Sequence, residues 1–266
     1  MARGAAHASW AYVACALVAL SAPWFFLTER ALFGWVLLAL GLAVAAAGNR
    51  RLAADLLPTA SGIAILGLLP VIGFAPAGAA LFAALLGLAV VVPWFVSRFL
   101  TRRDAVSFAW GDGWPWSRAR LWVLLAVPVA GVLVLAPYLV FAGGHEFWPP
   151  FRGASGAVTL ALGILALGLW EELFFIGVVA SSLRPHLAAW AAIALRVMVA
   201  VPLLWSWGFQ GLGPWIIAAF SVFQGWLWER TRSLSYVIAV HLAFDLALIA
   251  SLLWARYPGW LDAAGS

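Results

Sequence analysis

The sequence is poor in charge. Charged residues make up 9% of its 266 residues and hydrophobic residues 66%, against roughly 25% and about 45–50% in soluble domains. A soluble fold of this composition would leave large apolar surfaces in water, whereas a bilayer accepts them. The composition therefore excludes an ordinary soluble protein and predicts an all-α polytopic membrane protein.

Lysine is absent and cysteine occurs once. All 15 basic residues are arginines, and with the 10 acidic residues they give a net charge of +5. In a soluble protein it would suggest a nucleic-acid partner, but most of these arginines flank apolar runs, as loops facing lipid headgroups do. We therefore expect contact with the lipid bilayer and none with nucleic acid. The single cysteine, Cys15, excludes an internal disulfide.

The apolar runs predict about nine transmembrane helices. A helix needs about 20 apolar residues to cross a bilayer. The third and fourth runs are separated only by residues 75–77 and could form a re-entrant pair, which leaves eight or nine spans. A glycine-rich stretch before Pro214 predicts a broken helix ahead of a short eighth run. The runs lie near 10–27, 31–47, 56–75, 77–97, 121–141, 155–183, 187–207, 214–228 and 236–254.

The arginines give the predicted orientation. With nine spans, eleven arginines fall on the side of the N-terminus and three on the other, while Arg196 lies within a span. Because cytoplasmic loops carry the excess of basic residues, we predict a bacterial inner-membrane protein with a cytoplasmic N-terminus. The eleven are Arg3, Arg50, Arg51, Arg98, Arg102, Arg103, Arg118, Arg120, Arg184, Arg230 and Arg232, and the three are Arg30, Arg152 and Arg256.

A loop at 98–120 divides the sequence into two kinds of span. Before it the spans are nearly pure Ala, Leu, Val and Gly, and after residue 150 polar residues enter them. We predict an N-terminal transmembrane region at 1–150, with 98–120 as its basic cytoplasmic loop, and a second domain at 151–255. Trp170 lies inside a span and is expected to pack there. Tryptophans near span ends are expected at the membrane interface, namely Trp24, Trp35, Trp94, Trp148, Trp207 and Trp254.

Polar residues in the second half are the candidates for function. An ionisable group inside a bilayer costs about 2.5–3.5 kcal/mol on insertion scales, so each one needs a reason to be there. The first half offers only Asp55, near a span end, where we expect it at the interface. The second half contains Glu171, Glu172, Arg196, Gln210, Gln224, His241 and Asp245.

Two pairs among these residues suggest acid–base chemistry. Glu171 and Glu172 differ by about 100° around a helix, so one can face a reactive centre while a cation holds the other. His241 and Asp245 are four residues apart and share a helix face, so Asp245 could orient the imidazole. Both pairs could instead be structural, as an ion pair with Arg196 or a staple between helices. We expect these acidic and imidazole groups to converge with Arg196 on one cavity.

Other kinds of catalysis find less support in the sequence. A metal site built from the two glutamates, His241 and Asp245 is the weaker hypothesis, because no pair of histidines has metal-ligand spacing. No Ser/His/Asp arrangement or GxSxG elbow is present. We therefore expect no metal and no cofactor.

Over residues 155–250 the sequence resembles the CPBP family, the CAAX-processing and bacteriocin-processing membrane endopeptidases. The resemblance rests on Glu171-Glu172 followed by Leu-Phe-Phe-Ile-Gly, on Trp228-Glu229-Arg230-Thr231-Arg232-Ser233-Leu234, and on His241-Leu-Ala-Phe-Asp245. It implies a glutamic intramembrane protease with a CPBP-like helical core. Glu171 would then be the base and Glu172 a supporting acid, and His241 with Asp245 would stabilise the oxyanion.

Two positions depart from the family motifs. The arginine of EExxxR is Ile176 here, and Arg196 could replace it in space. The histidine of FxxxH corresponds to Phe209, which can neither carry a proton nor hold water. Gln210, the next residue, could hydrogen-bond a water but could not act as a base.

Three functions follow from these features. The first is a divergent CPBP-like endopeptidase, with full or impaired activity, that processes a membrane-anchored protein or peptide. The second is a catalytically silent relative that binds a membrane partner. The third is a proton-coupled transporter that relays protons through the buried acids, although the sequence lacks the internal repeats of many transporters.

The arginine distribution makes the topology testable. Reporter fusions placed after Arg120 should report the cytoplasm, and fusions at the C-terminus should report the exterior, because the eleven arginines would then face inward. A cytoplasmic C-terminus would mean that one span has been miscounted, with 56–97 the first region to re-examine.

Overall fold

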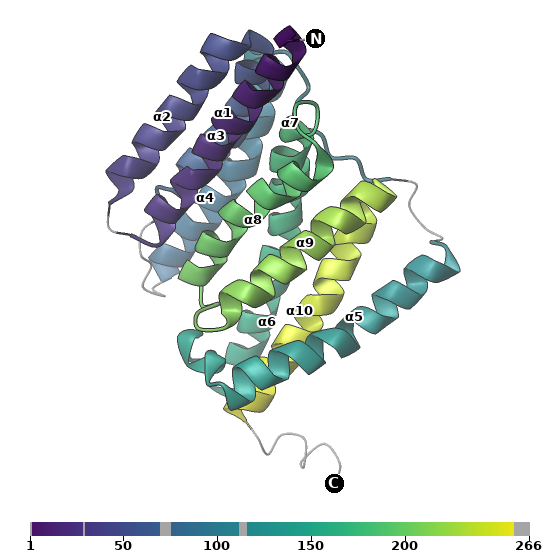
Figure 1. Ribbon diagram of the computed structural model, residues 1–266. Coiled ribbons are helices and arrows are strands. Elements are labelled where there is room, and N and C mark those ends of the chain that lie inside the picture. Colours follow the sequence, from purple (N-terminus) through teal and green to yellow (C-terminus); the bar gives the residue numbers. More distant parts are fainter. Residues whose placement is uncertain (1, 29, 70–75, 112–115, 258–266) are drawn as a thin grey trace.

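The computed structural model describes residues 2–28, 30–69, 76–111 and 116–257. Every regular element within these ranges is helical, and the long helices lie side by side as a bundle (Figure 1). Six of them are long and apolar enough to cross a membrane, and a shorter apolar stretch covers Trp10–Phe26. The prediction of an all-α polytopic membrane protein is confirmed.

The first half of the chain contributes four long helices and a fifth that lies apart from them. The fifth, α5, packs along α10 at the edge of the molecule far from α1 (Figure 1). Their bounds are α1 (Ala2–Phe26), α2 (Ala31–Gly48), α3 (Arg50–Leu66), α4 (Pro76–Phe95) with the π-helix η1 (Val96–Leu100), and α5 (Arg118–Ala136) with the π-helix η2 (Pro137–Phe141) and the short 3-10 helix η3 (Gly144–Phe147).

The second half contributes four rods that surround the polar residues. One rod is continuous through three elements, α6 (Gly153–Glu172), the π-helix η4 (Leu173–Ala180) and α7 (Ser181–Leu183). The others are α8 (Ala189–Ser206), α9 (Gly213–Thr231) and α10 (Leu234–Arg256). Helix α10 packs between α5 and α6, and α8 packs between α1 and α9.

The helical rods of the described residues follow the nine predicted runs in order, although several begin or end at other residues. Helix α3 begins at Arg50, six residues before the predicted start, because the Asn49 side chain caps it by accepting from Arg51 N at 2.9 Å. It ends at Leu66, and residues 70–75 of the predicted run lie outside the described residues. Helix α9 is not short, since it continues through Thr231 and ends where Arg232 takes a left-handed conformation.

Successive rods run in opposite directions, so the chain alternates between two ends of the bundle (Figure 1). At one end, which we call the arginine-rich end, Arg184 pairs with Glu229 at 2.5 Å. Here the amide of Leu234 also donates to the carbonyl of Ala109 at 2.8 Å. At the opposite end Arg256 Nη2 donates to the carbonyl of Trp148 at 3.0 Å. This alternation agrees with the arginine split, and which end faces the cytoplasm stays a prediction.

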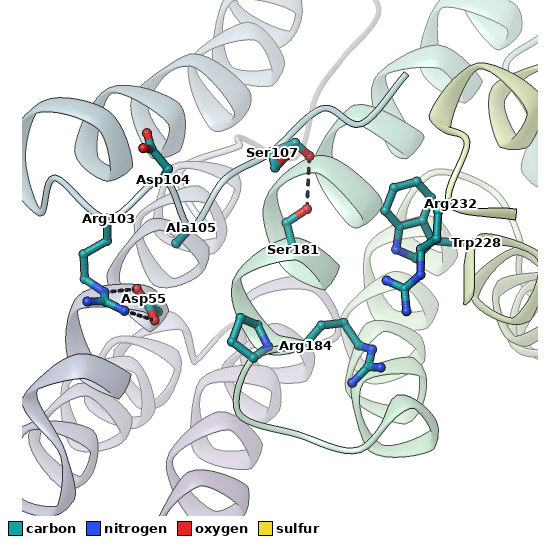
Figure 2. Close-up of a pocket in the computed structure, with 10 residues that line it drawn as sticks. Asp55, Arg103, Asp104, Ala105, Ser107, Ser181, Arg184, Trp228 and Arg232 are labelled. Carbon is teal, nitrogen blue, oxygen red and sulfur yellow. Dashed lines mark hydrogen bonds and ion pairs between the residues drawn. The ribbon is translucent and has the colours of Figure 1, made fainter. Parts of the chain in front are cut away.

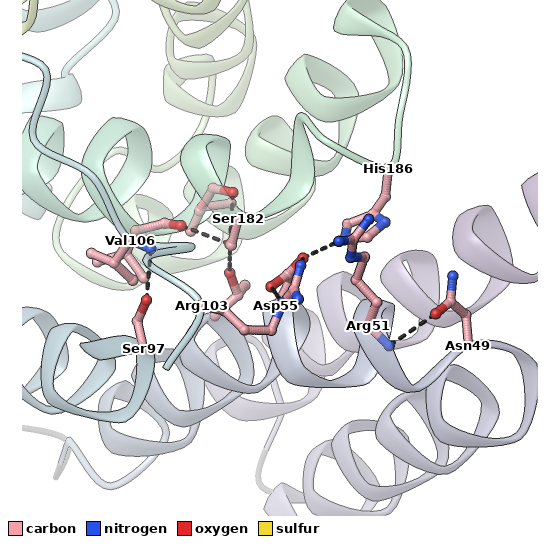
Figure 3. Close-up of polar contacts among 11 residues, drawn as sticks. Asn49, Arg51, Asp55, Ser97, Arg103, Val106, Ser182 and His186 are labelled. Atoms are coloured by element: carbon pink, nitrogen blue, oxygen red, sulfur yellow. Dashed lines mark hydrogen bonds and ion pairs between the residues drawn. The ribbon is translucent and has the colours of Figure 1, made fainter. Parts of the chain in front are cut away.

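Asp55 lies near the start of α3 and is buried within the protein, and its expected place at the membrane interface stays a prediction. Its side chain is 4% exposed and forms a paired hydrogen bond with the guanidinium of Arg103, while its Oδ2 lies 2.8 Å from His186 Nε2. Figure 3 shows Arg103 and His186 reaching Asp55 from two different connecting segments. The cluster therefore ties α3 to the 101–105 segment and to the loop between α7 and α8.

The largest hydrophobic core crosses the boundary predicted near residue 150. It contains side chains from α1 to α4 together with residues of α6, η4 and α8. Helices α1 and α2 approach each other closely, since a Cβ on Gly41 would lie 2.9 Å from the carbonyl oxygen of Ala14. Small residues at such crossings let membrane helices pack closely without interference from side chains.

The Asp55 cluster should contribute strongly to stability. Asp55→Ala leaves Arg103 and His186 without their carboxylate, and we expect it to lower the free energy of unfolding by about 2–3 kcal/mol. This is less than the roughly 3–5 kcal/mol of a fully buried pair, because the Arg103 side chain is 29% exposed. Arg98→Ala is the matched control, since its pair with Asp104 is exposed and should contribute about 0–1 kcal/mol. Equal losses for both variants, measured by unfolding in detergent, would contradict this ranking.

Candidate active site

Glu172 lies at the centre of a polar cluster inside the bundle. Its side chain is fully buried, and its Oε1 accepts hydrogen bonds from Arg196 Nη2 at 3.1 Å, Gln224 Nε2 at 3.1 Å and His241 Nδ1 at 2.7 Å. The three donors come from α8, α9 and α10, and Glu172 is the last residue of α6. One carboxylate oxygen thus joins all four helices of the second half, and a buried charge needs such donors.

Glu171 has a different environment although it is the adjacent residue. Its side chain is 13% exposed and lines a cavity, and its Oε2 lies 3.9 Å from His241 Nε2. Because the carboxylate of Glu172 can only accept, His241 donates through Nδ1 and turns Nε2 toward Glu171. The imidazole therefore lies between the two glutamates, which project about 100° apart around α6.

Asp245 lies beside this histidine but outside hydrogen-bonding range. Its Oδ1 is 3.8 Å from His241 Nε2, so the hydrogen bond that fixes the ring comes from Glu172 rather than from Asp245 as we expected. A Cβ on Gly168 would collide with Asp245 Oδ2, so the glycine allows α6 to approach α10 closely at this point. Oδ2 is buried and has no hydrogen-bond partner among the described residues.

Arg196 provides the cation that pairs with Glu172. The family arginine corresponds to Ile176, which is fully buried in a hydrophobic cluster, and Arg196 pairs with Glu172 in its stead. Arg196 is 3% exposed, and its Nε and Nη1 have no hydrogen-bond partner in the described part of the chain. It also lines the cavity beside Glu171, so these two nitrogens can donate to a bound molecule.

Gln224 is the site residue whose role the sequence did not reveal. An amide in a membrane span was visible as an unusual polar residue, but its partner depends on how α9 meets α6. Its Nε2 donates to Glu172 and lies 3.4 Å from the carbonyl of Val237 on α10. Gln224 therefore helps to hold the carboxylate and also links α9 to α10.

The structure brings Phe209 to the cavity and keeps Gln210 out of its lining. Helix α8 ends at Ser206, and Gly208 turns the chain with φ of 125°, a conformation that favours glycine. Phe209 then lines the cavity with its ring packed edge-on against Trp148, the centroids 5.1 Å apart. The Gln210 carbonyl accepts from Tyr138 Oη at 2.8 Å, and Gln210 does not appear among the cavity-lining residues.

The cavity itself is small and mainly apolar. It holds about 70 Å³, room for a few water molecules. Trp148 and Trp207 are part of its wall, a role that the sequence did not predict for them. Trp170 packs in the core as expected and donates its Nε1 to the carbonyl of Leu86 at 2.8 Å. No group of three or more His, Cys, Asp or Glu side chains in the described residues is arranged to hold a metal ion.

A second pocket lies at the arginine-rich end and is separate from this cavity. Figure 2 shows its lining, with Ser181 bonded to Ser107 and Asp55 bonded to Arg103. Its other arginines are also paired, since Arg184 and Arg232 both bind Glu229. None of its lining residues lines the cavity beside Glu171.

The sequence of these helices is similar to that of a known protein family. Residues 153–247 match the family model of the type II CAAX prenyl endopeptidase Rce1-like proteins. The resemblance to the CPBP family is confirmed. The match covers α6 through most of α10, the helices that carry the glutamates and His241, and it indicates a CAAX-protease-like intramembrane function. Neither a curated protein nor a solved structure matches the chain.

The unequal environments of the two glutamates predict unequal effects on stability. Glu172→Gln removes the charge that compensates the buried Arg196, so we expect a loss of about 3–5 kcal/mol in the free energy of unfolding. Glu171→Gln is isosteric, one residue away and at the cavity wall, and should change stability by less than about 1 kcal/mol. Unfolding in detergent measures both. A larger loss for Glu171→Gln would reverse the assignment of the structural and the cavity-facing acid.

Proposed function

We propose that this protein is an intramembrane endopeptidase of the CPBP type that cleaves a membrane-anchored protein or peptide, with Glu171 as the general base. The observation that carries the proposal is the division between the two glutamates. Glu172 is occupied by three donors, whereas Glu171 faces a cavity beside a histidine. We also propose that the protein resides in the bacterial inner membrane with its N-terminus in the cytoplasm, on the strength of the arginine split.

In this mechanism Glu171 takes a proton from a water molecule, and the resulting hydroxide attacks the carbonyl carbon of the scissile amide. The carbonyl oxygen becomes an oxyanion, and the proton then passes to the leaving nitrogen as the C–N bond breaks. The Nε2 of His241, 3.9 Å from Glu171, supports the base and can share this proton.

The oxyanion needs donors, and this chain differs here from the roles that the family resemblance implies. The carboxylate of Asp245 has no N–H to donate, unlike an asparagine at the same position. Arg196 lines the cavity, its Nε and Nη1 have no hydrogen-bond partner among the described residues, and its charge is compensated by Glu172. We therefore assign the stabilisation of the developing oxyanion to Arg196, a preorganised donor in a site with little water.

A catalytically silent relative is the second candidate, and Phe209 is the observation that favours it. A phenyl ring stands in the cavity wall at the motif position of the family histidine, and this ring cannot transfer a proton. In that case the cavity would bind a membrane-anchored partner without cleaving it.

One comparison tests both candidates. In the membrane proteome of the source cell, Glu171→Ala should accumulate unprocessed precursors that the wild type cleaves, because a general base contributes about 10²–10⁴-fold to the rate. Glu146→Ala is the control, an exposed carboxylate of η3 at the opposite end from the arginines. Identical precursor sets in wild type and Glu171→Ala would remove the protease proposal.

A second pair of variants separates the silent relative from the active enzyme. If the protein is silent, Phe209→His should create cleavage that still requires Glu171, since it supplies the missing imidazole. If the protein is active, Phe209→His should add little to the wild-type rate. Gln210→Ala is the matched control because Gln210 neighbours Phe209 but does not line the cavity.

A further inference from the structure

The candidate site lies closer to the arginine-rich end than to the opposite end. Arg196 and His241 are each seven residues from the start of their helices at the arginine-rich end. At a rise of 1.5 Å per residue this depth is roughly 10 Å. By distance alone, the shortest route to Glu171 would start from the arginine-rich end.

That short route is closed by packed side chains. Ile176, Gln224 and Val237 are all fully buried. Val237 is one helical turn nearer the arginine-rich end than His241, and its carbonyl lies 3.4 Å from Gln224 Nε2. The pocket at that end shares no lining residue with the cavity.

The cavity extends the other way, toward the opposite end of the bundle. From Glu171 and His241 its wall continues to Ile216 near the start of α9 and to the loops that flank α6 and α8 at that end. Trp148 comes from the first of these loops, and Trp207 and Phe209 come from the second. None of the lining residues belongs to a loop of the arginine-rich end.

Phe209 and Trp148 form an aromatic pair in the cavity wall on this longer route. Phe209 packs edge-on against Trp148 with ring centroids 5.1 Å apart. Tyr138 Oη, which bonds the carbonyl of Gln210 at 2.8 Å, holds the second loop against η2. Phe209 is half-buried, so its ring is partly exposed at this end of the cavity wall.

We infer that the substrate reaches Glu171 from the end opposite the arginine-rich end, past the side chains of Phe209 and Trp148. This inference rests on the proposed function and specifies what that site receives. A cavity of about 70 Å³ is too small for a peptide, so the aromatic pair must move aside when the substrate enters.

The lining also defines the occupant as an apolar, extended stretch of a membrane-anchored polypeptide. Most of the wall is aliphatic or aromatic, as at Leu167, Leu204 and Phe220. An anionic side chain would lose its hydration there without a free counter-charge, because Arg196 is already compensated by Glu172. The stretch must be extended, since a helix keeps its carbonyl groups in internal hydrogen bonds away from Arg196.

Site-directed thiol labelling tests the route without any proteolysis. In a Cys15→Ala background, three serines are replaced singly by cysteine: Ser221, which lines the cavity; Ser155, exposed near the start of α6 at the opposite end; and Ser181, at the pocket of the arginine-rich end. Small membrane-impermeant thiosulfonates, one cationic and one anionic, are added to membrane vesicles of either orientation.

We expect Ser221→Cys to react from the same side as Ser155→Cys, and several-fold faster when Phe209→Ala is added. Reaction only from the side of Ser181→Cys, or from neither side, overturns the inference. Labelling as expected together with unchanged processing in Glu171→Ala would reject the proposed protease while leaving the route in place. The reverse pattern would reject the route alone.

Discussion

The architecture of the second half depends on one buried carboxylate. Glu172 places a charge on a fully buried side chain, and its Oε1 is satisfied by donors from three other helices. This arrangement does more than offset the cost of burial. It fixes the ring of His241 so that Nε2 faces Glu171, and it holds Arg196 with two nitrogens free for a ligand. The positions of His241 and Arg196 thus follow from the hydrogen bonds that they donate to Glu172.

The π-helix that begins directly after Glu172 connects this centre to the surface. In η4 the wider turn leaves carbonyl groups available for partners outside the helix. The carbonyl of Gly177 accepts from the amide of Ser107 at 3.0 Å, and Ser181 Oγ, at the end of the π-helix, donates to the carbonyl of Ser107 at 3.0 Å. The segment before α5 is therefore fastened to the same rod that carries both glutamates. In a regular α-helix the carbonyl of Gly177 would accept from an amide of the same helix. The residues after Glu172 would also point in other directions around the helix axis.

The sequence was sufficient for the features that depend on composition and on the cost of burial. Apolar runs predicted the helices, and the absence of an arginine at Ile176 suggested that Arg196 replaces it, as its pair with Glu172 bears out geometrically. Features that depend on loop placement were not predictable. Trp148 and Trp207 have the sequence positions of interfacial anchors, yet their loops fold inward over a cavity. Asp55 lies near a helix end, and its burial comes from Arg103 and His186, which are distant in sequence.

The aromatic cap explains how a site with a phenylalanine at the histidine position could still serve hydrolysis. A carboxylate base such as Glu171 becomes more effective when bulk water is excluded, because electrostatic interactions strengthen as the local dielectric falls. The reaction nevertheless consumes a water molecule, and the small cavity leaves room for only a few. In the proposed mechanism, Phe209 and Trp148 exclude bulk water at rest and move aside for an apolar chain that enters from the end opposite the arginine-rich end. An imidazole at position 209 would bring bound water into the cavity wall, whereas the phenyl ring keeps this part of the wall apolar. In the proposed mechanism, proton transfer is then left to Glu171 and His241.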